Sequence, residues 1–322
     1  MAASRNSPPT DLPARVGEFL AARLAPDEPL CVGLSGGCDS VVLLHALVAA
    51  GWRPRLSALH VHHGLSANAD AWAAFCTDYC AGLGVPLTVV RVAVDAASRS
   101  GIEAAARDAR YAAFAAHGVS NLALAQHRGD QAETVLLNLL RGAGLTGAAA
   151  MPPAGRRGGL RLLRPLLACG RAELESYART HGLAWVDDES NADTRLTRNF
   201  LRHEVLTAIE ARLPGSEASL ARAAGHFAEA LGLLDELADQ DWQNVRRGDA
   251  AQLSGLRELS PARLKNLLRW RLRRLGWQVP VAARLDEFVR QLLAAGPDRH
   301  PELCLPGGRM RAGRGLLHWD GA

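Results

Sequence analysis

Short apolar runs alternate with longer helical stretches through the first 200 residues, and this alternation constrains the fold more than any other feature. Four runs have the length and apolar content of β-strands: LCVGL (30–34), LSALHVH (56–62), LTVVRV (87–92) and NLALAQ (121–126). The stretches between them predict helices, each closed by a glycine. This order predicts an α/β fold with a parallel sheet between helical layers, where ligands bind beyond the carboxyl ends of the strands.

The rest of the chain predicts a second domain. Residues 142–159 (GAGLTGAAAMPPAGRRGG) form a Gly/Ala/Pro-rich stretch that is too long for a simple connector, so we expect a functional loop there. Pro214-Gly215 indicates a boundary between a domain over 1–213 and a mainly α-helical domain over 214–322. The second domain is expected to end in a short β-hairpin around Pro306-Gly307-Gly308.

Composition narrows the class of protein but says little about its partner. The formal net charge is +4, and of 37 basic residues only Lys265 is a lysine, so arginine abundance is weak evidence for nucleic-acid binding. Six cysteines form no CxxC pair, and Cys76 and Cys80, four residues apart, are expected to be buried apolar residues. No apolar run has transmembrane length and the first sixteen residues lack the apolar core of a secretory signal, so we expect a cytoplasmic protein without a membrane partner.

The segment SGGCDS (35–40) lies between the first predicted strand and the following helix. Glycines allow backbone N–H groups to approach a ligand, the helix N-terminus favours an anion, and two serines can donate hydroxyl hydrogens. An acid beside a phosphate is repulsive unless a divalent cation lies between them, so Asp39 suggests Mg²⁺. The alternative is an ordinary helix cap, with Asp39 or Ser40 as the capping residue.

The loop resembles the SGGxDS pyrophosphate loop of the N-type ATP pyrophosphatases, also called PP-loop enzymes. These enzymes cleave ATP between the α- and β-phosphates and adenylate a carbonyl oxygen. The resemblance implies a Rossmann-like domain of the adenine nucleotide alpha hydrolase type. It also implies an ATP site that contains Ser35, Gly36, Gly37, Cys38, Asp39 and Ser40, with Mg²⁺ at Asp39.

Two further motifs follow the second and fourth strands. HVHHGLS (60–66) resembles the HVxHGL motif of tRNA(Ile)-lysidine synthases, which places His62 beside the adenosine; a zinc site is disfavoured because no partner ligand stands at suitable spacing. AQHRGDQAET (125–134) resembles the AHHxDDQxET motif of that family, but Gln126 and Gly129 replace its first histidine and first aspartate. Gln126 cannot act as a base near neutral pH.

The acids of this second motif have two interpretations. Asp130 and Glu133, three residues apart, would share one helical face and could bind an ammonium group. The alternative is that they are merely favourable acids in a first helical turn.

Two more segments agree with the same family. RGAGLTG (141–147) places Gly142 in a loop over ATP, although Gly142 could equally be a helix C-cap. DDESNADTRLTRNFLRHEV (187–205) resembles the DxSN…RNxxRH signature, and its Arg198 and Arg202 lie one helical turn apart. That pair is typical either of a solvated face or of contacts to phosphate or carboxylate.

The resemblance, which covers residues 27–210 well, implies lysidine formation on the wobble cytidine of the CAU-anticodon tRNA(Ile), using ATP, Mg²⁺ and free L-lysine. It implies catalytic roles for Asp39, His127, Asp130, Glu133 and Arg198, of which the last three would bind lysine. Basic residues Arg263, Lys265, Arg269 and Arg273 on a later helix, together with Arg202, are expected to contact tRNA. The chain is expected to end after one C-terminal domain, and a homodimer is compatible with the family.

Two other functions compete with this interpretation. A tRNA-thiolating PP-loop enzyme would use paired cysteines, and none are present as CxxC. A non-catalytic RNA-binding relative is suggested by Gln126 and Gly129, although Asp39, Asp130 and Glu133 persist.

Overall fold

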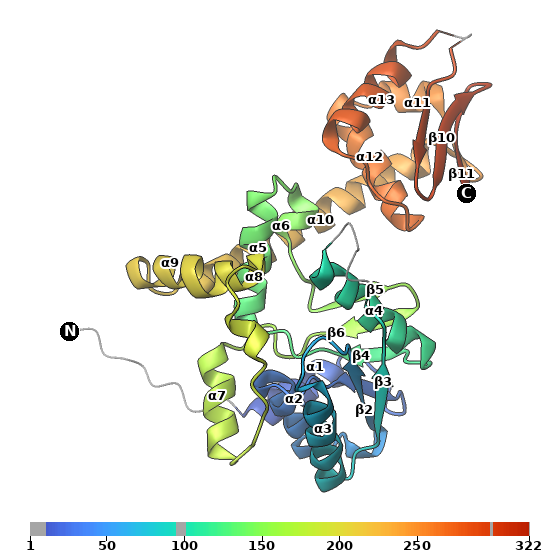
Figure 1. Cartoon of the computed structure of the whole chain (residues 1–322). Coiled ribbons are helices and arrows are strands. Elements are labelled where there is room, and N and C mark those ends of the chain that lie inside the picture. The colour runs from blue at the N-terminus through green and yellow to red at the C-terminus, as the bar shows by residue number, and fades with distance from the viewer. Residues whose placement is uncertain (1–10, 95–100, 297–298, 322) are drawn as a thin grey trace. The chain divides into compact units, whose positions relative to one another are not determined.

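The structure is a computed structural model that describes residues 11–94, 101–296 and 299–321 (Figure 1). The chain divides into two compact units, the first ending at His226 and the second beginning at Phe227. The division falls within a single helix, α10 (Ser216–Val245), thirteen residues beyond the boundary expected from the Pro-Gly pair. Each unit is described separately below.

The first unit contains a six-stranded sheet in the order β3-β2-β1-β4-β6-β5. All neighbouring strands are parallel except β5, which runs antiparallel to β6 at one edge. The predicted parallel α/β sheet is therefore confirmed, with one antiparallel edge strand added. The strands are β1 (Leu30–Gly33), β2 (Leu56–His62), β3 (Leu87–Arg91), β4 (Asn121–Ala123), β5 (Ala154–Arg157) and β6 (Leu160–Leu163).

Residues of the central strands contribute alternately to two cores, because successive side chains of a strand point to opposite faces. In β1, Val32 joins the larger core, and its neighbour Cys31 joins the smaller one; in β4, Ala123 and Leu122 divide in the same way. The larger core is covered by α1 (Leu12–Ala21), α2 (Cys38–Ala49), α3 (Ala69–Leu83) and α7 (Arg171–Thr180). The smaller core is covered by α4 (Ile102–Ala116), whose Tyr111 and Phe114 are buried against the sheet.

The strand order reverses between β1 and β4. From β1 the chain proceeds to β2 and β3 on one side, and it then returns to place β4 on the other side of β1. In open parallel sheets such a reversal opens a crevice beyond the carboxyl ends of the two strands. The SGGCDS loop follows β1 and the AQHRGDQAET motif follows β4, so the reversal brings the two motifs together.

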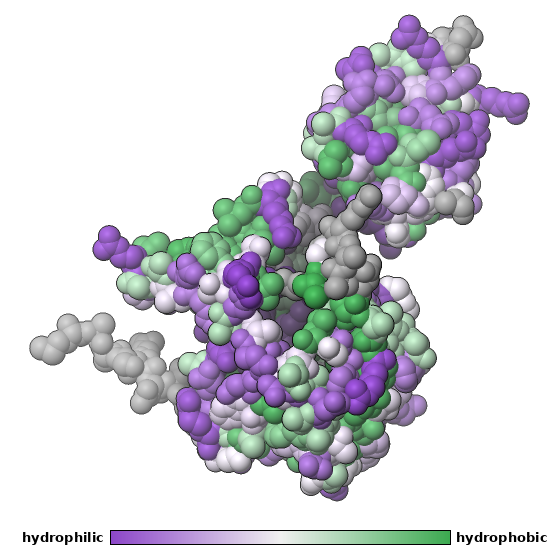
Figure 2. Space-filling model, in the orientation of Figure 1, coloured by the Kyte–Doolittle hydropathy of each residue, from purple (hydrophilic) through white to green (hydrophobic). Residues whose placement is uncertain are grey.

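The remaining segments of the first unit include the predicted functional loop and several short helices. The predicted functional loop over 142–159 is partly ordered, because it contains the short helix α6 and strand β5, which pairs with β6. Figure 2 shows apolar side chains gathered over the arm formed by α5, α6 and α9, where Leu140, Leu145 and Leu213 are exposed. The segments are α5 (Arg128–Leu140), α6 (Leu145–Ala148), the 3₁₀ helix η2 (Glu189–Ala192), α8 (Thr197–Phe200), the π-helix η3 (Leu201–Leu206) and α9 (Thr207–Arg212). Another 3₁₀ helix, η1 (Arg53–Arg55), precedes β2.

The second unit combines helices with a five-stranded antiparallel sheet in the order β7-β8-β11-β10-β9. The expected hairpin is confirmed, but it belongs to this larger sheet, so the unit is less helical than the sequence indicated. Leu264, Leu268 and Leu272 form a buried stripe on α12 and pack with Phe288 of α13. The elements are β7 (Arg246–Arg247), β8 (Ala250–Gln252), α11 (Leu253–Glu258), α12 (Pro261–Arg274), α13 (Ala282–Ala294), β9 (Glu302–Leu305), β10 (Gly308–Gly313) and β11 (Leu316–Gly321).

Candidate functional site

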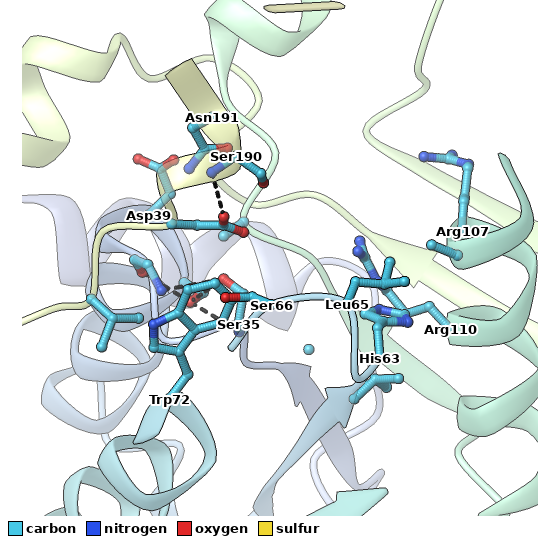
Figure 3. Close-up of a pocket in the computed structure, with 18 of the residues that line it drawn as sticks. Ser35, Asp39, His63, Leu65, Ser66, Trp72, Arg107, Arg110, Ser190 and Asn191 are labelled. Carbon is cyan, nitrogen blue, oxygen red and sulfur yellow. Dashed lines mark hydrogen bonds between the residues drawn. The ribbon is translucent and has the colours of Figure 1, made fainter. Parts of the chain in front are cut away.

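A cavity of about 1140 Å³ lies in the first unit at the carboxyl ends of β1, β2 and β4. Its walls come from segments that are far apart in sequence: the SGGCDS loop, the end of β2, α3, α4 and the stretch 186–196 (Figure 3). Polar side chains including Ser35, Asp39, Ser190 and Asn191 lie around the cavity in the close-up. The volume is slightly above the usual range of small-molecule sites, about 300–1,000 Å³.

The SGGCDS loop is shaped to expose backbone N–H groups. Gly36 has φ +89°, and a Cβ there would lie 2.9 Å from a methyl carbon of Val186, so only glycine fits. The hydroxyls of Ser35 and Ser40 lie 3.1 Å apart, and Ser35 Oγ accepts a hydrogen bond from the Gly37 N–H. Gly37 is the N-cap of α2, and no side chain caps this helix. The alternative in which Asp39 or Ser40 caps the helix is therefore wrong, and the helix N-terminus is available to an anion.

Asp39 presents a carboxylate oxygen that has no partner in the protein. Its Oδ1 is buried without a hydrogen bond, whereas Oδ2 lies 3.7 Å from both His127 Nε2 and Arg171 Nη1. Burial raises the pKa of this carboxyl above its usual range, against the opposing charges of His127 and Arg171. An unsatisfied buried oxygen beside a phosphate-type loop fits Mg²⁺, which usually binds one or two protein carboxylates and takes its other ligands from substrate phosphates and water.

His127 is held in a defined orientation at the start of α5. Its Nδ1 accepts a hydrogen bond from the Gly129 N–H at 3.0 Å, and its own backbone N–H donates to Asp130 Oδ2 at 2.9 Å, which together form a capping box. Because Nδ1 is an acceptor here, Nε2 is the ring nitrogen that carries a proton. This nitrogen faces the carboxylates of Asp39 and Asp130 at 3.7 and 3.8 Å.

The two departures from the family motif have structural correlates. A Cβ at Gly129 would lie 2.8 Å from His127 Cε1, so a side chain there would displace the ring. The same Cβ would lie 3.6 Å from an oxygen of Glu217, whose other oxygen accepts a hydrogen bond from Arg128 Nε at 2.9 Å. The carboxylate of Glu217 on α10 therefore lies near the place that an acidic side chain at position 129 would occupy.

Gln126, the other departure, is bound to a buried arginine. Its side-chain oxygen accepts a hydrogen bond from Arg164 Nε, and Arg164 also donates to the carbonyl of Pro152. A neutral histidine could accept one such bond, but glutamine does so without the risk of a second buried positive charge.

Asp130 and Glu133, the predicted ammonium partners, share one arginine of this chain. Arg202 Nη2 lies 2.9 Å from Asp130 Oδ1, and its Nε donates to Glu133 Oε1. Glu133 is buried, its Oε2 has no partner, and burial raises the pKa of its carboxyl despite Arg202 and the nearby charge of Arg198. Arg202 was expected to contact tRNA; in the structure its guanidinium pairs with the carboxylates of Asp130 and Glu133.

The stretch 186–193 lines the cavity and is hydrogen-bonded to the segments that follow β1 and β2. The Val186 N–H donates to the Gly36 carbonyl at 3.0 Å, and Glu189 accepts hydrogen bonds from Ser66 and Asn68 beyond β2. The buried amide of Asn199 donates to two carbonyls of this stretch, at Ser190 and Asp193. The asparagine of the RNxxRH signature therefore shapes the cavity wall.

Two predicted ATP residues occupy different places. His62 lines the cavity, is buried, and lies 3.2 Å from Asp70. Gly142 has φ +70° just beyond the end of α5 and is not among the residues that line the cavity, which corresponds to the helix C-cap interpretation.

Among the cavity residues that sequence reasoning missed are three arginines and a tryptophan. Arg107 and Arg110 reach the cavity from α4, Trp72 from α3 and Arg171 from α7. Arg110 lines the cavity while desolvation by the surrounding chain lowers the pKa of its guanidinium. The signal that could have found the first two is their i, i+3 spacing in ARDARY, which puts two cations on one helical face.

The predicted tRNA-binding residues lie on α12 in the second unit, where most of them are paired. Arg263 forms a two-pronged pair with the buried Asp241, Lys265 pairs with Asp286 at 2.8 Å, and Arg273 pairs with Asp235. Arg269 is half-buried. Acids from α10 and α13 therefore neutralise much of the cationic face that the sequence indicated.

Two comparisons with known proteins decide the family. Residues 9–209 match the PP-loop domain, and residues 252–318 match the TilS substrate binding domain. The tRNA(Ile)-lysidine synthase of Nitrosomonas europaea is 42% identical over 99% of this chain. The chain belongs to the tRNA(Ile)-lysidine synthase family. The synthase of Burkholderia pseudomallei is 49% identical over 95% of this chain, and the chain spans 64% of that relative's length and 71% of the Nitrosomonas relative's.

The fold of this lysidine synthase family member is shared with a solved structure of low sequence identity. The U34-tRNA thiolase NcsA from Methanococcus maripaludis superposes with a TM-score of 0.55 over 68% of this chain and 78% of its own, at 17% identity. At that identity the likeness concerns the fold alone. Within the described residues, no helix has the length and apolar character needed to cross a bilayer.

Proposed function

We propose that this chain ligates L-lysine to C2 of the wobble cytidine in the CAU-anticodon tRNA(Ile), which changes codon specificity from AUG to AUA. The observation that carries the proposal is one cavity that combines an uncapped helix N-terminus, the unpartnered oxygen of Asp39 and the carboxylate of Asp130. Family membership supports the substrate class, and the polar groups of the cavity support its use by ATP and lysine.

In the first step, the C2 carbonyl oxygen of cytosine attacks the α-phosphorus of ATP. An oxygen–phosphorus bond forms, the bond from the α-phosphorus to the bridging oxygen breaks, and pyrophosphate leaves with the electron pair. The N–H groups at the start of α2 and the hydroxyls of Ser35 and Ser40 bind the growing negative charge of the leaving group.

Mg²⁺ would be held at Asp39 Oδ1, and when bound it would neutralise charge on the departing pyrophosphate. Positively charged groups of the protein surround this carboxylate even without the metal. His127 and Arg171 lie on the Oδ2 side, so Oδ1 is left facing a ligand. Arg107 and Arg110 add positive charge on the opposite wall of the cavity.

In the second step, the ε-amino group of lysine attacks C2, the bond from C2 to the AMP oxygen breaks, and AMP leaves. The ammonium must lose one proton before attack and the adduct must lose a second. Asp130 lines the cavity and can bind the ammonium and accept a proton, while Glu133 lies behind it under Arg202. Lysine therefore shares Asp130 with Arg202 or displaces this guanidinium, and we assign the lysine carboxylate to Arg198, whose charge acts on the neighbouring Glu133.

Thiolation is the competing chemistry, and the cysteines disfavour it. Cys38 is at the phosphate loop, but burial raises the pKa of its thiol to about 11, so the thiol is protonated at neutral pH. The thiols of Cys76 and Cys80 are buried in α3, with pKa values raised by burial to about 12 and 11. The expectation that these two are buried apolar residues is confirmed.

The deciding experiment is incorporation of radiolabelled lysine into a tRNA(Ile) transcript. We expect incorporation that requires ATP, with one AMP and one pyrophosphate released per lysine. The matched control is the same transcript with uridine in place of the wobble cytidine. Uracil keeps the C2 carbonyl but lacks the N4 amino group of cytosine, and this transcript should accept no lysine. Binding of tRNA without incorporation would leave the non-catalytic interpretation, and a thiolated product would support the competitor.

A further inference from the structure

A carboxylate from α10 lies at the start of α5, where the sequence motif has an acid and this chain has a glycine. Glu217 stands in the first turn of α10, and one of its carboxylate oxygens lies 3.6 Å from the position of a Cβ at Gly129. Its other oxygen accepts a hydrogen bond from Arg128 Nε at 2.9 Å, across 89 residues of sequence. Glu217 therefore lies beside the first two residues of α5.

The glycine at position 129 allows this carboxylate and the ring of His127 to occupy the place together. A Cβ there would lie 2.8 Å from His127 Cε1, so an acid on α5 itself would push against the ring. Negative charge near a helix N-terminus is favourable, because the aligned peptide dipoles leave partial positive charge there. An acid that comes from α10 brings this charge without the contact to the ring.

Arg128, the partner of Glu217, joins the starts of two helices. Its backbone N–H donates to the Cys169 carbonyl at 2.9 Å. Its guanidinium lies so close to Gly170, the N-cap of α7, that a Cβ there would clash with it. Arg128 is the first residue of α5 and Arg171 is the first residue of α7. The ion pair of Arg128 with Glu217 therefore lies where the N-terminal ends of α5 and α7 meet.

These two helix starts carry the groups around Asp39. His127, the N-cap of α5, and Arg171 of α7 each lie 3.7 Å from Asp39 Oδ2. Oδ1 of the same carboxylate is buried and has no partner. The placement of α5 against α7 therefore decides which oxygen of Asp39 remains available to a ligand.

The backbone of Glu217 is itself held in place. Glu210 of α9 accepts hydrogen bonds from the N–H groups of Gly215 and Glu217 and from the hydroxyl of Ser216. These bonds satisfy N–H groups that the first turn of a helix leaves without partners. The carboxylate of Glu217 thus extends from a hydrogen-bonded turn toward α5.

We propose that Glu217 is a positioning residue for the pyrophosphate site. It supplies from α10 the acid that α5 lacks at position 129, and through Arg128 it holds the starts of α5 and α7 together. The two groups beside Asp39 then keep their places, and the other oxygen of this carboxylate stays available to a ligand. The inference rests on the proposed function, because it takes Asp39 to be the carboxylate on the phosphate side.

The test compares an acid with its amide at position 129 in three backgrounds: wild type, E217Q and E173Q. The side chains introduced by G129D and G129N have nearly the same shape, so their contact with the His127 ring cancels in a ratio. E217Q removes the charge and keeps a side-chain oxygen that can accept a hydrogen bond. Glu173 is the matched control, because it pairs with Arg15 and its side chain is 35% exposed, as is that of Glu217.

The measurements are the Kd of Mg²⁺–pyrophosphate, by titration calorimetry of the full chain, and urea unfolding without ligand. In wild type and E173Q, an acid at position 129 faces the carboxylate of Glu217, so G129D should bind more weakly than G129N. In E217Q the acid replaces the lost charge, and the ratio of the two Kd values, Asp over Asn, should fall on the order of fivefold. Unfolding should show G129D as the less stable of the two in wild type and the more stable in E217Q.

A lower Kd ratio in E217Q alone, together with the reversed order of stability, supports the proposal. The same ratio in all three backgrounds overturns it. A reversal in unfolding without a change in the ratio also overturns it, because Glu217 would then be a structural ion-pair partner only. A wild-type chain that does not bind Mg²⁺–pyrophosphate overturns it as well.

The single variants decide the proposal if a side chain at position 129 prevents folding. E217Q and E173Q have the same net charge, and E217Q should bind Mg²⁺–pyrophosphate about threefold more weakly; equal affinities would overturn the proposal. Lysine incorporation plays no part in these measurements. A wild-type chain that binds Mg²⁺–pyrophosphate but incorporates no lysine would therefore refute the proposed function, while the Kd values still decide the role of Glu217.

Discussion

Substitution of Asp39 by asparagine should stabilise the fold and abolish the chemistry at the same time. Asparagine has nearly the same shape, so the change removes a charge and little else. In the ligand-free protein, Oδ1 of Asp39 is buried with no partner, and burial raises the pKa of the carboxyl above its ordinary value of 3.8. A carboxyl whose pKa is raised by folding destabilises the folded state at neutral pH.

The size of the effect follows from two opposed contributions. Asparagine leaves an unsatisfied polar atom in the same place, so the gain is only the extra cost of burying a charge there, about 1–2 kcal/mol. Loss of the attraction to Arg171 and His127, each at 3.7 Å, offsets part of this gain. We therefore expect D39N to raise the free energy of unfolding by about 1 kcal/mol at pH 7, and Tm by about 2–4 °C.

The pH dependence of unfolding gives a second test of whether D39N is more stable than wild type. Because the folded-state pKa is raised, the stability linked to this proton is present below pH 3.8 and is lost as the pH rises through the folded-state value. The advantage of D39N should thus be full at pH 7 and shrink as wild-type Asp39 takes up its proton in mild acid. Urea unfolding at pH 7 and at pH 4.5, with EDTA present, measures both values.

Bound Mg²⁺ and pyrophosphate should make wild type more stable than D39N. Mg²⁺ and pyrophosphate at 100 times their Kd stabilise wild type by about 2.7 kcal/mol, and D39N should gain much less. AMP release in the lysine assay should fall by about 10²–10³ in D39N, the usual effect of removing one group that stabilises transition-state charge. A variant that is less stable than wild type at pH 7 without ligand, or that releases AMP at a near-normal rate, would refute the reasoning.

Three other substitutions test separate parts of the site. Gly129→Ala should cost about 1–3 kcal/mol of unfolding free energy, because its Cβ displaces the buried ring of His127; urea unfolding and lysine incorporation should both show the loss, and a neutral result would mean that the ring moves freely. Arg202→Ala should cost about 3–5 kcal/mol at neutral pH, since it leaves Glu133 charged and unpaired; its deficit should lessen in mild acid, and a pH-independent deficit would contradict the pairing. Cys38→Ala should retain lysine incorporation within about threefold, because a thiol with a pKa of about 11 is no nucleophile; loss of AMP release in a well-folded variant would assign chemistry to the sulfur.

The sequence predicted the central sheet well because its signals are local. Each of the first four strands is a compact apolar run between turn residues, and each lies where the pattern placed it, within a few residues at its end. Strand β5 (AGRR) escaped prediction because it has no apolar pattern of its own. It is a strand only because it pairs with β6 at the sheet edge, which is a tertiary effect.

The site was predictable where a motif fixes it and not where distant residues meet. The SGGCDS loop and the residues after β4 lie in one crevice, as expected of segments at the carboxyl ends of parallel strands. The pairing of Arg202 with Glu133 joins positions 69 residues apart, and Arg263 meets Asp241 across 22 residues. Sequence shows such charges but not which of them neutralise each other, so the cationic face of α12 was overestimated.

The unequal covering of the two sheet faces has a consequence for motion. Among the described residues, four helices pack on the sheet face of the larger core, while α4 is the helix that packs on the face of the smaller core. Opening free energies in a protein vary from region to region, and regions with few buried apolar contacts open first. Amide hydrogens of α4 should therefore exchange with solvent well before those of α2. The cavity can then widen for a large substrate by movement of α4, while the SGGCDS loop keeps its conformation.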